Sequence, residues 1–256
     1  AADNTNTFYK IKQAGTKPQW HRGNWTVEDS INLQGNLRAY AHAGHTEGHT
    51  LTLGTTGAAG TVSGSAYIQA MTTNNQGSKI KSASPLFPAT LSGTHSDFGC
   101  MISPYRLIQV EDVILKGSCK TGNNGFENTA TLKLIGDVVW GDKAGGGAEI
   151  KFPLTDSASN DTGQTLDVSG ASVSIEIPLF YMSGNCDVSD AILRVNKFSS
   201  VNAKTWTSNA GSKIIYQNAT AANTSCLMPE LVGSSKQMKN SQYGSTITAN
   251  TNIGSD

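Results

Sequence analysis

The stretch Cys100-Met-Ile-Ser-Pro-Tyr-Arg-Leu-Ile-Gln-Val-Glu-Asp-Val-Ile-Leu-Lys-Gly-Ser-Cys119 carries two features on which the fold prediction rests. A β-rich run, 106–115, lies between two cysteines that could close on each other. The run does not alternate cleanly, because apolar and polar residues share each of its two parities. We therefore predict a strand that bends or bulges near Glu111 and Asp112 before it returns to the core.

The cysteine count indicates where the protein resides. Four cysteines, Cys100, Cys119, Cys186 and Cys226, form no CxxC pair, which excludes zinc-ribbon and thioredoxin-type sites. They allow three pairings, of which the sequential one, Cys100–Cys119 with Cys186–Cys226, keeps each bridge local. Each bridge would stabilise the fold by about 3–4 kcal/mol. The alternative is four buried free thiols in a reducing compartment.

Composition points to an exported protein. Only 15% of the 256 residues are charged, so Asn, Ser, Thr, Gly and Gln must supply most of the solubility. The net charge is zero, which argues against a nucleic-acid partner. No stretch approaches the roughly 18 apolar residues of a membrane span. The start Ala1-Ala2-Asp3 resembles what remains after signal-peptide removal. We expect an extracellular or cell-surface protein that passes through an oxidising compartment.

Strand signals recur along the chain every 10–15 residues, with turn residues between them. Apolar residues share one parity in three clear runs: Ile31, Leu33, Leu37 and Ala39; Ala130, Leu132 and Leu134; and Val173, Ile175, Ile177 and Leu179. The run 8–11 predicts an edge strand, or a donor strand that completes a neighbouring subunit's sheet. The range 187–198 is the best helical candidate, because Ile192, Val195 and Phe198 recur every three residues.

These signals predict an all-β fold, an antiparallel β-sandwich or jelly-roll-like barrel with at most one or two short helices. We see no internal repeat. A single domain over residues 1–256, with loose terminal segments, fits the length. The linker-like composition of 155–165 leaves a two-domain division there as the alternative.

Histidines gather in one short segment. In an extended chain His45, Glu47 and His49 lie on one side, and two imidazoles with a carboxylate are ligands that zinc accepts. Their order matches neither HExxH nor HxxEH, and same-face strand neighbours lie about 7 Å apart, which is wide for one tetrahedral ion. The alternative is a polar loop that carries histidine, and no cofactor is required.

Two tryptophans flank a polar segment. Trp20 and Trp25, with Asn24 between them, combine indole faces that stack on sugar rings with a hydrogen-bonding amide. This predicts a glycan-binding site, whereas the alternative places both indoles in the core.

We find no catalytic motif in the sequence, so we expect a protein that is not an enzyme. The low charge, the even cysteine count and the strand spacing favour a bacterial surface adhesin or a fimbrial or filament subunit. Such a protein would bind host glycans or neighbouring subunits. The alternatives are a viral or phage structural protein, either capsid or receptor-binding, and a secreted carbohydrate-active enzyme.

Overall fold

The computed structural model describes residues 5–21, 23–39, 49–70, 78–120, 130–141, 149–152, 164–177, 179–182, 185–195 and 198–199, with short pieces at 205–209, 211–216, 227–228, 235–236, 241–242 and 251–255. The chain divides into two compact units, Ala1–Cys119 with Thr131–Lys133, and Lys120–Ala130 with Leu134–Asp256. Whether they make one domain, or whether a boundary lies at 155–165, stays a prediction.

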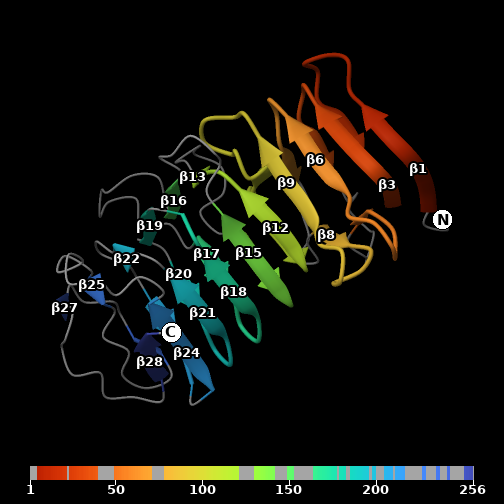
Figure 1. Ribbon diagram of the computed structural model, residues 1–256. Helices are drawn as coiled ribbons and strands as arrows, with labels where there is room; N and C mark the ends of the chain where they lie inside the picture. The colour runs from red at the N-terminus through yellow and green to blue at the C-terminus, as the bar shows by residue number, and fades with distance from the viewer. Residues whose placement is uncertain are drawn as a thin grey trace. The chain divides into compact units, whose positions relative to one another are not determined.

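Short strands and turns make up the first unit (Figure 1). The strands are β1 (Thr5–Lys12), β2 (Gln19–His21), β3 (Asn24–Leu33), β4 (Leu37–Ala39), β5 (Thr50–Leu53), β6 (Thr61–Gly64), β7 (Ile68–Ala70), β8 (Ser78–Ser82), β9 (Ala89–Gly93), β10 (Ile102–Ser103), β11 (Leu107–Glu111) and β12 (Val113–Lys116). β13 (Cys119–Lys120) and β14 (Thr131–Ile135) lie where the chain passes between the units.

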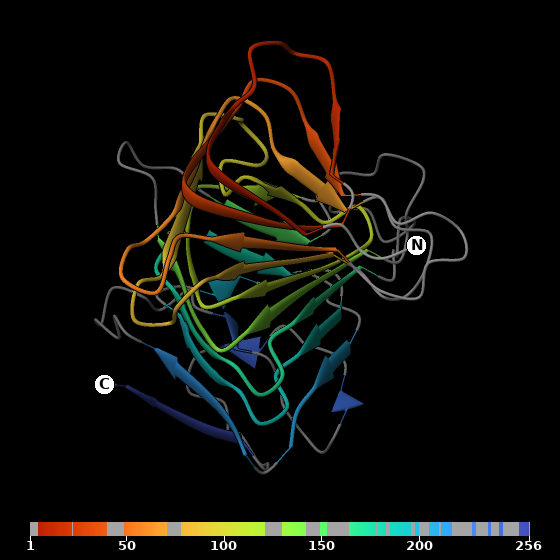
Figure 2. The ribbon, with the colours of Figure 1, turned by 90° about the vertical axis from the view of Figure 1, so that its right-hand side faces the viewer.

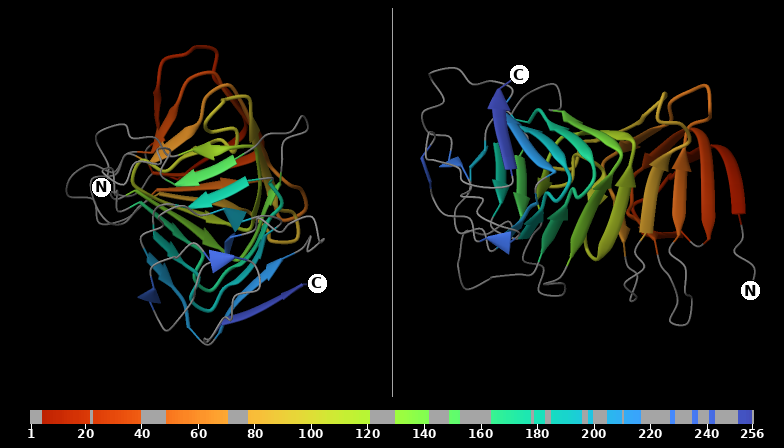
Figure 3. Two further views of the ribbon diagram at one scale, coloured as in Figure 1. Left: turned by 90° about the vertical axis from the view of Figure 1, so that its left-hand side faces the viewer. Right: turned by 90° about the horizontal axis from the view of Figure 1, so that it is seen from below.

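The strands of the first unit pair in parallel, so the predicted antiparallel sandwich or barrel is wrong. β1 pairs with β3, β3 with both β5 and β6, and these with β8 and β9. A separate parallel sheet joins β2, β4, β7 and β10. The chain thus winds as a coil, and each full turn of it, here called a circuit, stacks in register on the one before, as in a parallel β-helix. Figure 2 shows these circuits nearly end-on, and the right panel of Figure 3 shows the red and orange strands side by side.

Stacking in register builds the core from rows of equivalent side chains. One row runs through Ile31, Val62, Leu91 and Leu115, and each of these residues is at most 1% exposed. Burying each such side chain stabilises the fold by about 1.5–3 kcal/mol. The opposite parity faces out and pairs across strands, for example Lys79 with Glu111 at 2.7 Å. The alternation of buried apolar and outward-facing polar residues along each strand is therefore the predicted one, but the strands run in parallel.

Corners between strands require unusual backbone angles. Asp112, between β11 and β12, has φ +53°, in the left-handed region that few residues other than Gly, Asn and Asp adopt. The bend predicted near Glu111 and Asp112 is thus confirmed as a corner. Gly35, between β3 and β4, is also at a corner: a Cβ there would lie 2.6 Å from the carbonyl oxygen of Thr16 on the neighbouring circuit.

The second unit repeats the design. Its strands are β15 (Asp137–Gly141), β16 (Glu149–Phe152), β17 (Thr165–Asp167), β18 (Ser172–Ile175), β19 (Leu179–Met182), β20 (Asn185–Asp187), β21 (Ile192–Val195), β22 (Phe198–Ser199), β23 (Thr205–Thr207), β24 (Ser212–Tyr216), β25 (Leu227–Met228), β26 (Ser235–Lys236), β27 (Ser241–Gln242) and β28 (Thr251–Ser255). The pairings β15–β18–β21–β24–β28, β17–β20–β23 and β16–β19–β22 are parallel. Two short pairings, β23–β26 and β25–β27, are antiparallel.

A 20-residue repeat, which the sequence reading missed, lies within this unit. β17, β20 and β23 stack in register with their starts 20 residues apart, at Thr165, Asn185 and Thr205. The turns that follow β17 and β20 are built alike. The carboxylate of Asp167 accepts the amide of Ser169 at 2.9 Å, and the equivalent bond in the next circuit joins Asp187 and Ser189 at 2.9 Å.

The helix predicted over 187–198 is wrong. β20 ends at Asp187, β21 spans Ile192–Val195 and β22 begins at Phe198. Asp190 has φ +55° and marks the corner between the first two of these strands. Val195 therefore ends one strand and Phe198 begins the next, so the spacing of three residues between them does not come from one helical face. The described residues contain no helix, so none could cross a membrane.

Candidate functional site

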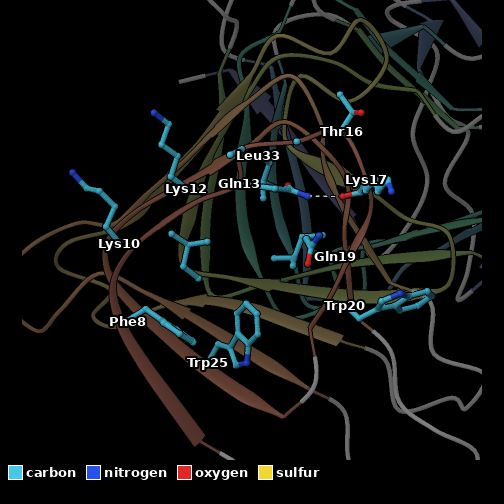
Figure 4. Close-up of a pocket in the computed structure, with 14 residues that line it drawn as sticks. Phe8, Lys10, Lys12, Gln13, Thr16, Lys17, Gln19, Trp20, Trp25 and Leu33 are labelled. Atoms are coloured by element: carbon cyan, nitrogen blue, oxygen red, sulfur yellow. Dashed lines mark hydrogen bonds between the residues drawn. The ribbon is translucent and has the colours of Figure 1, made fainter.

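A cavity of about 860 Å³ lies at the β1 end of the first unit, where the edge of β1 away from β3 pairs with no described strand. Its walls come from the first two circuits of the chain. The lining residues are Phe8, Lys10, Ile11, Lys12, Gln13, Ala14, Gly15, Thr16, Lys17, Gln19, Trp20, Trp25, Leu33 and Leu37 (Figure 4). A volume of this size is typical of small-molecule sites, which combine an apolar lining with a few polar groups.

Aromatic rings form one wall of the cavity. The Phe8 and Trp25 rings pack edge to face, with centroids 5.1 Å apart, and both point into the cavity in Figure 4. Trp25 also packs edge to face on His21 at 4.5 Å. The alternation of β1 and β3 places these rings inside. The packing holds the Trp25 ring in one orientation, which a stacking surface for a ligand requires.

The opposite wall is the corner 13–18, and hydrogen bonds fix it. The Gln13 amide group donates to the carbonyl of Lys17 at 2.8 Å and accepts the backbone amide of Gly35 at 3.1 Å. The backbone amide of Gln19 donates to the carbonyl of Asn36 at 2.9 Å. Because Gln13 is buried and uses both ends of its amide, it serves the scaffold and not a ligand.

Polar groups reach the cavity from β2 and the rim. The exposed Gln19 side chain points toward the cavity centre in Figure 4. Lys10 and Lys12 contribute their stems, while their amino groups extend away from the centre. The Lys10 amino group pairs with the Asp29 carboxylate at 3.1 Å. A hydrogen bond from Ser30, and then the contact with Lys10, hold the pKa of Asp29 below its usual value.

Below the aromatic wall lies a buried histidine pair. His21 is 2% exposed, and burial, together with the nearby His49, lowers its pKa to about 3. Among the described residues, its Nε2 has no hydrogen-bond partner. The His49 ring lies 5.9 Å away, and its Nδ1 accepts the backbone amide of Gly23 at 2.9 Å. A neutral His21 therefore belongs to the packing that supports Trp25.

The structure separates the predicted glycan-binding residues. Trp25 lies in the cavity, whereas the Trp20 ring, 46% exposed, points away from it at the rim (Figure 4). The Arg38 guanidinium lies 5.5 Å from the centroid of the Trp20 ring, because the two residues are neighbours on paired strands. The side-chain oxygen of Asn24 accepts the backbone amide of Thr50 at 3.0 Å, which is a structural role.

The predicted metal site lies mostly outside the described residues, which include His49 but neither His45 nor Glu47. Within the described part of the chain, no three His, Cys, Asp or Glu side chains gather closely enough to hold a metal ion. Zinc binding by this segment stays a prediction.

The predicted Cys100–Cys119 bridge is not formed. Cys100 and Cys119 are free buried thiols whose sulfur atoms both lie near the carbonyl oxygen of Ile102, at 3.5 and 3.9 Å. Cys186 is also a free buried thiol, and its predicted partner Cys226 lies outside the described residues. Burial raises the pKa of Cys119 and of Cys186 well above the usual thiol value, so neither is a reactive thiolate at neutral pH.

Comparison with known proteins gives no relative: no protein-family model matches the chain, and no curated protein or solved structure is found similar to it. Function must therefore be argued from the site.

Sequence reading missed most residues of the cavity, including Phe8, Ile11 and Gln19. Phe8 and Ile11 were recognised as part of an edge strand, but nothing marked that strand as the open end of a stack. The signal for Gln19 was present, because a residue two positions before the buried His21 shares its face of the strand.

Proposed function

We propose that this protein is an exported bacterial surface adhesin or filament subunit that binds a saccharide in the cavity at the β1 end. The observation that carries the proposal is the aromatic wall of Phe8 and Trp25 in a cavity of about 860 Å³. The face of an indole ring is a suitable surface for the C–H face of a sugar. The Gln19 amide provides a donor and an acceptor for hydroxyl groups.

The scaffold supports this role physically. The corner 13–18 is tied to the next circuit by Gln13, and Trp25 is held between Phe8 and His21. Binding then requires little ordering of the protein, which keeps the entropic cost of association low. Export rests on the low charge and on the Asn, Ser and Thr content, since the described cysteines supply no disulfide in its favour.

A glycan array with the purified protein tests the proposal. Trp25→Ala should weaken binding of the best glycan at least tenfold, because about 1.4 kcal/mol of stacking energy corresponds to that factor. Ala14→Trp, which places a large side chain on the cavity lining from an exposed position, should block binding without removing the aromatic wall.

Two matched variants locate the site. Tyr9→Ala removes an aromatic ring that is 69% exposed and does not line the cavity, and it should bind glycan as the wild type does. Trp20→Ala removes the outward-facing indole. If Trp20→Ala abolishes binding while Trp25→Ala and Ala14→Trp leave it intact, the outer face and not the cavity is the site. If no glycan binds, the saccharide proposal fails.

A further inference from the structure

We propose a second recognition function at the same end of the first unit: the free edge of β1 binds an extended peptide segment of a partner protein, with apolar residues on its inner side and Asp or Glu on its outer side. This inference does not depend on saccharide binding. It rests on the backbone of β1, on the open core beside it and on the charges along its outer side.

The backbone of β1 is bonded on one side only within the described residues. Seven of its eight residues pair in parallel with β3, and the register shifts at Tyr9. By contrast, β6, β8 and β9 each have a parallel neighbour on both sides. Figure 1 shows β1 as the last strand at its end of the first unit. The unpaired N–H and C=O groups of such an edge are a template for one more strand.

The core beside β1 is open to receive side chains. A strand added to β1 would set its inner residues over Phe8 and Ile11, as β1 sets Ile11 over Ile31. The cavity at this position is lined by the apolar side chains of Trp25 and Leu33, among others. Inner residues that are apolar would therefore continue the rows of the core and bury the apolar lining.

The outer side of β1 selects the charge of the partner. Lys10 and Lys12 are exposed there, and Lys10 already meets one carboxylate, that of Asp29 on β3. A second copy of β1 would bring lysines against lysines, which is unfavourable between neighbouring strands. Acidic residues on the added strand would instead form cross-strand pairs, as Asp29 does from the other side. Charge complementarity thus points to an acidic, amphipathic strand and away from self-pairing.

The test uses three synthetic peptides and the full chain. The probe is an eight-residue peptide that alternates Ile or Val with Glu. The controls are the same peptide with Lys in place of Glu, and the Glu peptide with two central residues replaced by Pro, which removes backbone donors. Binding is measured by calorimetry, and hydrogen exchange of the β1 amides is followed by mass spectrometry. The Glu peptide should bind at least tenfold more tightly than either control and should protect the β1 segment.

Reversal of the charges makes the test decisive. Lys12→Glu should weaken binding of the Glu peptide and strengthen binding of the Lys peptide. Lys116→Glu, at an exposed lysine on β12, should change the binding of neither peptide. Equal binding of the Glu and Lys peptides, or binding without protection of β1, would overturn the inference. Protection of β1 in the free protein, or concentration-dependent self-association that Lys12→Glu does not alter, would overturn it as well.

Discussion

Acidification from pH 6.5 to pH 3 is expected to lower the free energy of unfolding by on the order of 4–5 kcal/mol through His21 alone. In the folded protein, burial and the neighbouring His49 hold the pKa of His21 at about 3, whereas the pKa of a histidine in the unfolded chain has its usual value of about 6.5. Between these two values the unfolded chain binds a proton that the folded protein does not. Stability is therefore fully present above pH 6.5 and is lost as the pH falls, at up to about 1.4 kcal/mol per pH unit.

Urea denaturation of the wild type and of His21→Phe at several pH values between 7 and 3 measures this effect. Both proteins share every other titrating group, so the difference between their unfolding free energies isolates the histidine. His21→Phe should become progressively more stable relative to the wild type as the pH falls. A difference that does not change with pH would contradict the burial of a neutral His21 beneath Trp25.

Gly64→Ala is expected to destabilise the first unit by about 3 kcal/mol or more. Gly64 has φ +125°, where residues with a side chain are strained, and it is paired in register with Leu33. An added Cβ would overlap the carbonyl oxygen of Leu33 on the neighbouring circuit, and backbone in a stacked coil has little room to move. The expected loss of stability is therefore a consequence of the parallel stacking that brings Leu33 against Gly64.

The matched control for Gly64→Ala is Gly57→Ala. A Cβ at Gly57 would meet no atom within 4 Å, so this variant should keep the stability of the wild type. Thermal and urea unfolding followed by far-ultraviolet circular dichroism give the comparison. Equal stability of the two variants would show that Gly64 does not stack on Leu33, and would count against the register of the whole unit.

Alternation along single strands could be predicted from the sequence, but the direction of strand pairing could not. Ile31, Leu33, Leu37 and Ala39 were assigned to one parity, and all four are buried. A period of two is the same in parallel and antiparallel sheets, so this pattern carries no information about direction. In addition, Leu33 and Leu37 belong to different strands, β3 and β4, on two sides of the coil.

The signal for a coil was the repeated turn, and not the strands. Asp167 and Asp187 begin equivalent turns 20 residues apart, and the corner residues Gly170 and Asp190 both have positive φ. A glycine and an aspartate can share this role, although as letters in a sequence they do not look alike. Most strands are only two to five residues long and are separated by variable corners, which hid the remaining circuits.

The candidate site was predicted in part. Trp25 was selected for its chemistry, and the structure places it in the cavity wall. Trp20 was selected with it, but alternation in β2 puts Trp20 on the face opposite to Gln19 and the buried His21. The cavity itself follows from β1 being the end of a stack, and no local pattern in the sequence expresses that position.

The most direct test of the central claim, recognition in the cavity at the β1 end, is an NMR titration that follows the four tryptophan indole N–H signals while the best glycan from the array is added. Assignment by single Trp→Phe variants identifies each signal. The structure predicts that the Trp25 signal shifts with saturation, whereas the signal of Trp140, fully buried in the second unit, does not move. A glycan that saturates the protein while the Trp25 signal stays in place would contradict the claim.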